Sequence, residues 1–441
     1  MQMNKEIFRI AVPNIISNIS VPLMGLISTA IVGNWSGSAQ VIGSLAVGVS
    51  IFNFIYWNCS FVRMGTSGLT AQAFGANDFH ETTAMLARSV VVSLALGILV
   101  FIFQRPLGEL SLWLMNGDEM VAEYFYARVW AVPAGILLFG LYGWFTGMQN
   151  AVIPMTTSLV VNTLHIVVSY FFVFSYDMGI VGIAYASVVA QWVGLVLAVS
   201  LLLIFFRKTL RPIKLIEALN LSAMREFFVV NGDIIVRTFC NVGVYTFFTA
   251  ASARMGDAAI LAVNTILMQL LMLFSYMNDG FAYAAEAMTG RFIGAKDRPS
   301  LHRCLKLCVI WTFATAAIAI SLYLFGWREI FSLFMTSGTE DEIARILEVA
   351  GRYVGWIVVI PLFAALPFML DGVMAGATLT RVMRNSMLVA TIAFFAIYYA
   401  LLPVMGNDAL WLAFTMYIIL RLVLQYFMAH RLNDIYAKAE R

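Results

Sequence analysis

The 441-residue chain has little charge, and this scarcity already narrows its class. Only 12% of its residues are charged, against about 25% in soluble domains. Hydrophobic residues make up 61%, and apolar runs longer than about 18 residues recur throughout. Within a bilayer such runs must form helices, because no water satisfies their backbone groups. The sequence therefore predicts an all-α, polytopic membrane protein, and its net charge of +3 is too small to suggest a nucleic-acid partner.

Cysteine is also scarce, which excludes a disulfide framework. The four cysteines are Cys59, Cys240, Cys304 and Cys308. Cys304 and Cys308 stand four apart, but His302 is the only further metal ligand nearby, so a metal site is the weaker interpretation.

Catalytic patterns are missing as well. No Ser-His-Asp set, His-x-x-x-x-Asp pair, glycine-rich phosphate loop or metal cluster stands at the end of an apolar run. We therefore expect no enzyme activity and no cofactor. The first run contains Pro13, Asn14, Asn18 and Pro22 and differs from a cleavable signal peptide, so it is counted as a span.

The hydrophobic runs predict twelve transmembrane helices in two lobes. We expect an N-terminal six-helix lobe over residues 1–206, a basic linker over 207–224 and a C-terminal six-helix lobe over 225–441. The linker is partly amphipathic, which favours a helix at the membrane surface. The expected spans are 7–33, 41–72, 84–104, 121–146, 156–175, 180–206, 225–252, 260–290, 303–326, 349–375, 385–404 and 408–430.

The distribution of lysine and arginine predicts the orientation. The termini and even-numbered loops carry 18 of these residues, and the opposite loops carry 6. Arg63, Arg237 and Arg421 are assigned to spans. Because positive loops stay on the cytoplasmic side, we expect both termini in the cytoplasm of a cell with this protein in its plasma or inner membrane.

The chain contains an internal repeat. Gly37-Ser-Ala-Gln-Val-Ile matches Gly256-Asp-Ala-Ala-Ile-Leu, and Phe74-Gly-Ala-Asn-Asp matches Ile293-Gly-Ala-Lys-Asp, both at an offset of 219. Later matches, such as Gly147 with Gly376, lie at up to 229. Each half has an even number of spans, so the halves enter the membrane in the same sense. Transporters built from such parallel repeats bind substrate at or near the repeat interface and alternate access by rocking.

The repeat shows where the two halves differ in polarity. The second half carries the acids within its spans, and the first half carries neutral polar groups at the matching places. Asp233 falls opposite Asn14, Arg237 opposite Asn18, Asp279 opposite Ser60, Glu286 opposite Ser67 and Asp371 opposite Tyr142. Only the second half is therefore expected to titrate or to hold a cation.

Three segments carry a family resemblance. They are Arg63-Met-Gly-Thr-Ser-Gly-Leu-Thr-Ala-Gln-Ala-Phe-Gly, Asn278-Asp-Gly-Phe-Ala-Tyr-Ala-Ala-Glu-Ala, and the run from Asp371 to Asn385. With the twelve spans, they resemble the DinF-like branch of the multidrug and toxic compound extrusion (MATE) family. The resemblance implies export of small organic, often cationic or amphiphilic compounds, driven by protons or sodium ions.

The sequence departs from many of these relatives in its first span. They carry an aspartate where this chain has Ser28, and serine cannot carry a proton through a cycle. The resemblance therefore moves the expected coupling site to the second lobe, where Asp371 matches an acid that other relatives use. Pro361 and Pro367 are expected to bend this helix and free carbonyls, so Asp371 could bind a proton or a sodium ion.

The remaining coupling candidates lie on two other spans. Asp233 and Arg237, with Asn241, share one helix face, because they are spaced by four. They form either a structural pair or a switch in which Arg237 binds Asp233 or Asp371. Asp279 and Glu286 share a face of the eighth span and are secondary candidates.

A set of polar and soft side chains is expected to line the substrate cavity. His165 is a possible proton or substrate contact, although a lone histidine is more often a packed hydrogen-bonding group. The set is Asn14, Asn18, Ser28, Trp57, Tyr142, Asn162, His165, Asn241, Met268 and Phe274.

Two other functions remain open. A lipid-linked oligosaccharide flippase of the same superfamily would need a more cationic cavity than Arg237 and Arg63 provide. A channel would need rings of polar residues from symmetric subunits, whereas we expect a monomer.

Overall fold

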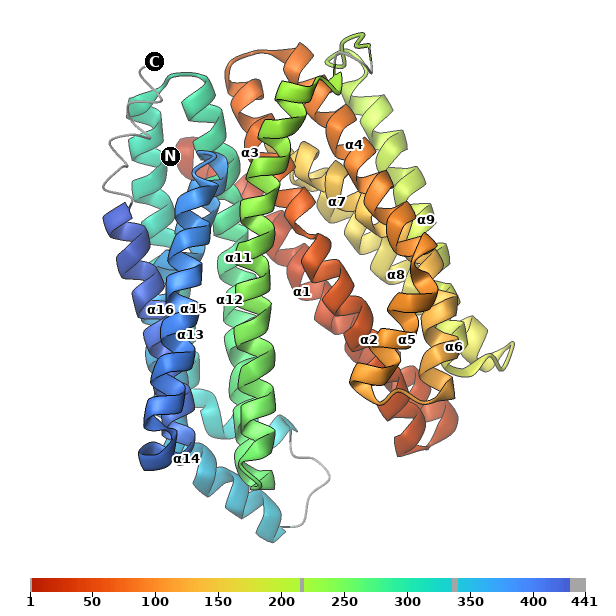
Figure 1. The fold of residues 1–441 in the computed structure, drawn as a ribbon, viewed down its shortest axis with the longest axis vertical. Helices are drawn as coiled ribbons and strands as arrows, with labels where there is room; N and C mark the ends of the chain where they lie inside the picture. The colour runs from red at the N-terminus through yellow and green to blue at the C-terminus, as the bar shows by residue number, and fades with distance from the viewer. Residues whose placement is uncertain (1, 215–217, 335–339, 429–441) are drawn as a thin grey trace. The chain divides into compact units, whose positions relative to one another are not determined.

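The computed structural model describes residues 2–214, 218–334 and 340–428. It divides the chain into two compact units, and each is described separately. The N-terminal unit comprises Val12–Asn231, and the C-terminal unit comprises Met1–Ala11 with Gly232–Arg441. The division differs from the expected lobes of 1–206 and 225–441, because α1 (Gln2–Ser36) and α11 (Leu221–Arg254) each contribute to both units (Figure 1).

Helices fill both units, and their bounds follow chain order (Figure 1). Besides its part of α1, the N-terminal unit contains α2 (Ala39–Cys59), α3 (Phe61–Gly75), α4 (Phe79–Ile102), α5 (Gln104–Met115), α6 (Glu119–Arg128), the 3-10 helix η1 (Val129–Ala131), α7 (Val132–Gly147), α8 (Val152–Phe174) and α9 (Gly179–Phe206). The C-terminal unit contains most of α11, then α12 (Ala258–Gly294), α13 (Arg298–Phe334), α14 (Glu340–Gly376), α15 (Thr380–Met405) and α16 (Asn407–Met428).

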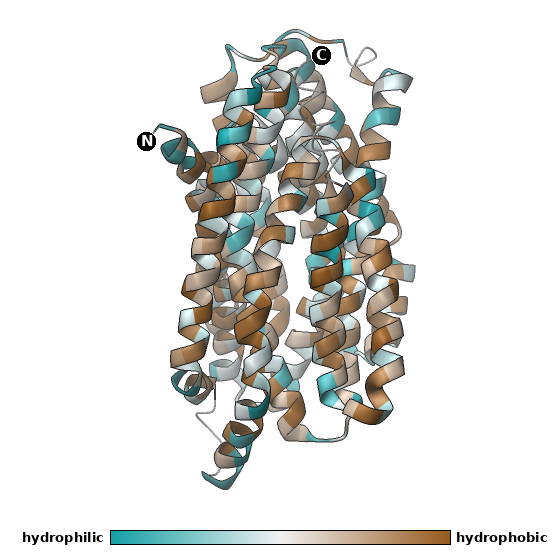
Figure 2. Ribbon diagram, turned by 90° about the vertical axis from the view of Figure 1, so that its left-hand side faces the viewer, coloured by the Kyte–Doolittle hydropathy of each residue, from teal (hydrophilic) through white to brown (hydrophobic). Residues whose placement is uncertain are grey.

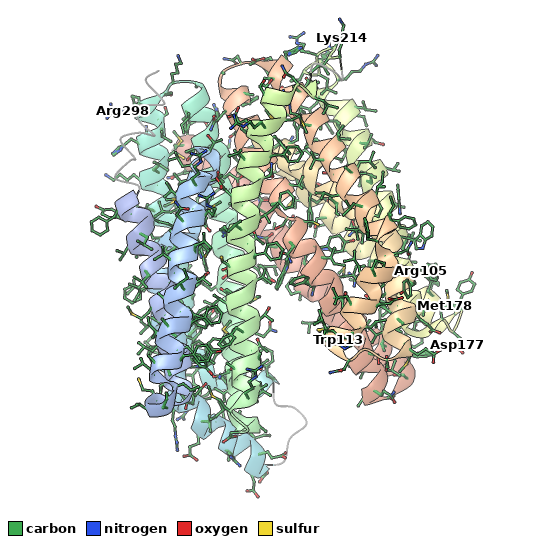
Figure 3. The ribbon with its side chains drawn as sticks, in the orientation of Figure 1. Arg105, Trp113, Asp177, Met178, Lys214 and Arg298 are labelled. Carbon is green, nitrogen blue, oxygen red and sulfur yellow. The ribbon has the colours of Figure 1, made fainter. Side chains whose placement is uncertain are left out.

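Twelve helical segments of the described chain are long and apolar enough to cross a membrane, which confirms the predicted number. Two of them, Ala39–Gly75 and Glu119–Gly147, join successive shorter helices. Hydrophobic residues dominate the middle of many helices, and hydrophilic residues gather at many of their ends (Figure 2). In the N-terminal unit, Lys214 lies at one end, and Trp113 and Asp177 lie at the opposite end (Figure 3). These ends fit the two faces of a bilayer.

The backbone repeats the duplication seen in the sequence. Left-handed residues recur at equivalent turns, as shown by Asn77 (φ 56°) with Lys296 (φ 55°), and Gln149 (φ 63°) with Thr378 (φ 55°). A close helix crossing recurs too. A Cβ on Gly143 would lie 2.3 Å from the carbonyl oxygen of Arg63, and one on Gly372 would lie 2.1 Å from that of Ala282. Only glycine allows backbones to approach so closely.

The two units differ in the continuity of equivalent helices. The 37-residue helices α12, α13 and α14 are unbroken. Their counterparts in the N-terminal unit are broken into α2 and α3, α4 and α5, and α6 and α7. The first break falls at Ser60, which matches Asp279 in the repeat.

The segment after α9 packs with the N-terminal unit. Residues 207–214 form turns and irregular backbone rather than the expected surface helix, and 215–217 lie outside the described residues. Arg88 of α4 donates to the Ala218 carbonyl at 2.6 Å, and Phe227 of α11 is buried against Leu69 and Met85. These contacts explain why the boundary between units lies at Asn231 rather than near residue 206.

Candidate functional site: a buried charge network

Asp371 is the centre of a charged network inside the C-terminal unit. It lies on α14, beyond Pro361 and Pro367, and is only 2% exposed. Its Oδ2 accepts hydrogen bonds from Arg237 of α11 and Arg421 of α16. Its Oδ1 accepts from Gln425 Nε2 at 2.6 Å. A single carboxylate therefore joins three helices.

The two arginines differ in their surroundings. Arg421 is 1% exposed, and its guanidinium lies 5.3 Å from the centre of the Phe368 ring, within cation–π range. Arg237 is partly exposed and also lies within electrostatic range of Asp279 on α12. Arg421 is therefore an enclosed partner of Asp371, whereas Arg237 is partly exposed and is also influenced by the charge of Asp279.

Asp233 forms a second, separate ion pair. Its carboxylate accepts from Arg384 at 2.6 Å and from the Thr380 hydroxyl at 2.8 Å, both on α15. Arg237 therefore pairs with Asp371, one of its two expected partners, rather than with Asp233. The spacing of four predicts the shared face but not the partners, because the partners come from the neighbouring helices α14 and α15.

Other predicted residues lie around these pairs in the same unit. Glu286 is buried on α12, and its backbone lies beside Gly376 of α14. Asn241 accepts from the Tyr417 hydroxyl at 3.1 Å. Phe274 is buried in the hydrophobic core, and the half-buried Met268 packs against that core.

The N-terminal unit brings together the polar residues predicted on its first and fifth spans. His165, which is 3% exposed, has Ser28 Oγ 3.1 Å from Nε2 and Ser187 Oγ 3.3 Å from Nδ1. Asn162 donates to Ser20 at 2.7 Å. Ser28 thus belongs to a hydroxyl–imidazole cluster, and the described hydrogen-bond partners of His165 in it are serine hydroxyls.

The remaining predicted cavity residues have different environments. Asn14 is buried and accepts from Arg63 at 2.7 Å. Asn18 and Tyr142 are half-buried, and Trp57 is exposed. Arg63 thus binds a neutral amide at the place where the second half carries Asp233.

Two further arginines are buried in helices, although the loop count above assigned them to loops. Arg88 pairs with Glu81 at 2.6 Å. Arg128, which is 9% exposed, donates to the Tyr124 hydroxyl. Besides Arg63, the helices of the first half therefore contain two buried arginines that the loop count did not place there.

The described residues hold no group of three or more His, Cys, Asp or Glu side chains that could bind a metal ion. All four cysteines are free thiols. Cys304 and Cys308 are buried with their sulfur atoms 3.9 Å apart.

Comparison with known proteins decides the family. The MatE family profile matches residues 13–171 and 234–404, one block in each half of the chain. The chain belongs to the MatE family.

Individual relatives of this MatE protein agree. It is 34% identical over 424 residues to the DNA damage-inducible protein F of Escherichia coli, covering 95% of this chain and 90% of that protein. It is 22% identical to the probable multidrug resistance protein NorM of Acinetobacter baylyi, covering 78% of each chain. These matches confirm the DinF-like resemblance and place the chain among transporters rather than enzymes.

Solved structures support the fold. A crystal structure of MATE in the bent conformation has a TM-score of 0.86 at 16% identity, covering 100% of this chain and 98% of that chain. A MOP superfamily transporter from Pyrococcus furiosus, described as having a binding pocket of reverse polarity, has the same TM-score at 18% identity, with 100% and 97% covered.

Sequence reasoning missed several partners in this MatE protein. Gln425 and Arg384 were not considered, and Arg421 was noted only as an arginine within a span. A signal was available, because Tyr417, Arg421 and Gln425 are spaced by four and share one face of α16. Arg384 gave no such signal, since it lies near the start of α15 and resembles an ordinary loop cation.

Proposed function

We propose that this MatE protein is a proton-coupled antiporter that exports small organic compounds, with Asp371 as the coupling carboxylate. The observation that supports this most is the binding of one buried carboxylate to Arg237, Arg421 and Gln425. Charges within membrane helices are costly and usually mark ion pathways. A role in proton coupling would explain why these helices contain such a network.

Proton binding at Asp371 would discharge the network. The neutral acid would leave Arg237 and Arg421 without their shared anion, and like charges would then repel. Arg421 is enclosed, whereas Arg237 is partly exposed and already within range of Asp279. We therefore assign the moving part to Arg237, which would shift from Asp371 toward Asp279. The proton drives the change through its different affinity for the two arrangements.

A proton fits this site better than a sodium ion. Hard cations require several oxygen ligands. Both oxygens of Asp371 accept N–H donors, two of which carry positive charge. A sodium ion would have to displace a guanidinium and then find further oxygens.

The wider setting of the proposal combines the relatives with the loop charges. Names such as multidrug resistance protein NorM support small organic substrates and argue against the flippase. We propose that the protein lies in the cell's inner or plasma membrane as a monomer, with both termini in the cytoplasm. Export then follows alternating access between the two units.

Efflux from proteoliposomes tests the proposal. Purified protein is reconstituted with a fluorescent organic cation inside, and a pH gradient or a sodium gradient is imposed separately. The pH gradient should drive efflux, and the sodium gradient should not. Asp371→Asn should lower the rate of pH-driven efflux at least about tenfold, which corresponds to about 1.4 kcal/mol in activation free energy. Asp257→Asn, which removes an exposed acid of the same unit, is the matched control.

Two results would overturn the proposal. One is efflux driven by sodium alone. The other is equal pH-driven efflux by the wild type and a correctly folded Asp371→Asn protein.

A further inference from the structure

A small cavity lies inside the N-terminal unit. Its volume is about 20 Å³, enough for one water-sized occupant. Arg128, Tyr56, His165, Ser187 and Gln191 contribute its polar lining, and Met24, Val161 and Ala190 complete it. No aspartate or glutamate lines the cavity.

Arg128 brings a positive charge to this cavity. In the described part of the chain, it donates one hydrogen bond, to the Tyr124 hydroxyl, and its guanidinium lies 4.8 Å from the centre of the Phe52 ring. Among the described residues, no carboxylate forms an ion pair with it, whereas the buried Arg88 of the same unit is paired with Glu81. Aromatic rings compensate a cation only in part, and a buried charge normally requires an opposite charge.

The cavity also contains unused hydrogen-bond donors. Within the described chain, the buried Nε of Arg128 and the buried hydroxyl of Tyr56 have no hydrogen-bond partner. Such groups are rare in native proteins and usually bind an ordered water or an ion. The Gln191 amide is a further donor at the wall, whereas the Ser187 hydroxyl already donates to the Ile183 carbonyl. The lining therefore offers donors and positive charge to a single small guest.

We propose that this cavity binds a small monovalent anion, for which chloride is the probe. The anion would accept from Arg128 Nε and from the Tyr56 hydroxyl, and it would supply the opposite charge that the surrounding residues lack. A water molecule could satisfy the donors but not the charge. The site is independent of Asp371 and would stabilise the N-terminal unit.

Bromide soaking of crystals of the full-length protein tests the position. Bromide replaces chloride and scatters anomalously. One anomalous peak is expected within hydrogen-bond distance of the Arg128 guanidinium and the Tyr56 hydroxyl. A fully occupied site without anomalous signal would identify water and overturn the proposal.

Thermal unfolding in detergent tests the binding. Chloride is exchanged for gluconate at constant ionic strength, and the midpoint of the wild type should rise with chloride and then saturate. Arg128→Gln should abolish this rise, whereas the matched control Arg88→Gln should keep it. If Arg128→Gln does not fold, Tyr56→Phe should raise the half-saturating chloride concentration several-fold. An equal chloride response of the wild type and the folded Arg128 or Tyr56 variant would contradict the proposal.

Discussion

The two units of this protein have equivalent helices but use charge in different ways. In the C-terminal unit, acids and arginines pair inside unbroken helices, as in Asp371 with Arg421 and Asp233 with Arg384. In the N-terminal unit, the counterpart of α14 is broken into α6 and α7, and Arg63 and Arg128 bind neutral oxygen atoms. Ser28 and His165 form a hydroxyl–imidazole cluster there.

This difference shows which features duplication preserves. The glycine crossings at Gly143 and Gly372 remain, because any larger residue would collide with backbone. Side chains within the units are less constrained, so Tyr142 and Asp371 occupy equivalent positions with unrelated chemistry. A common frame can therefore hold a coupling network in one unit and a different polar cluster in the other.

The largest predicted effect is on stability, at Arg421. Arg421→Met would leave Asp371 with Arg237 and Gln425 and should destabilise the protein by about 3 kcal/mol, because it breaks a buried ion pair. Urea or thermal unfolding in detergent would measure this change. Trp192→Met, at the equivalent position of the other unit, should cost less than about 1 kcal/mol, since Trp192 is an exposed side chain. Equal losses of stability in the two variants would contradict the proposed difference in charge pairing between the units.

The next effect is on the pH dependence of transport. Arg237→Ala removes one of the two cations that favour the ionised form of Asp371, so Asp371 should bind its proton at higher pH. The pH–rate profile of efflux should therefore move toward higher pH by about one unit. An unchanged profile in a well-expressed protein would contradict the switch.

A smaller effect is expected in the N-terminal unit. His165→Phe introduces phenylalanine, the residue type at the equivalent position of the C-terminal unit, Phe394. Ser28 and Ser187 each keep a hydrogen bond to a carbonyl of their own helix, so the loss of stability should be about 1 kcal/mol. The pH profile of efflux should stay unchanged. A shift comparable to that of Arg237→Ala would place coupling in both units.

The smallest effect concerns two helix caps outside the spans. Hydrogen bonds from Ser44 and the backbone of Val121 lower the pKa of Asp118, and the backbone of Ala259 and the charge of Arg345 lower the pKa of Asp257. Their stabilisation is therefore complete above the ordinary value of 3.8 and is lost as pH falls through the lowered pKa.

Unfolding scans between pH 3 and pH 7 measure this loss. Asp118→Asn should slightly reduce the fall in stability at acidic pH, and so should Asp257→Asn. An unchanged fall in both variants would exclude the two caps as its cause.

Much of the fold could be predicted from the sequence. Apolar runs give the number of membrane helices, because a bilayer permits little else. The repeat gives the equivalence of the halves, and the backbone bears it out at Asn77 and Lys296. The domain boundary could not be found, because Asn231 and Gly232 lie within one helix and only tertiary contacts assign them to different units.

The candidate site was predictable in part. Asp371 and Arg237 stand out as charges in apolar runs, but their pairing depends on how three helices pack, which spacing alone does not encode. Arg128 was missed because it lies near the expected start of a span, where an arginine is ordinary. Its burial results from the aromatic rings of Phe52 and Tyr124, which come from two different helices.

Infrared difference spectroscopy tests the central claim most directly, because it detects the protonated carboxyl group itself. On acidification, the wild-type protein should show a carboxylic-acid C=O band that Asp371→Asn abolishes and Asp279→Asn retains. A band that persists in Asp371→Asn and disappears in Glu286→Gln would contradict the account and move the coupling proton to Glu286.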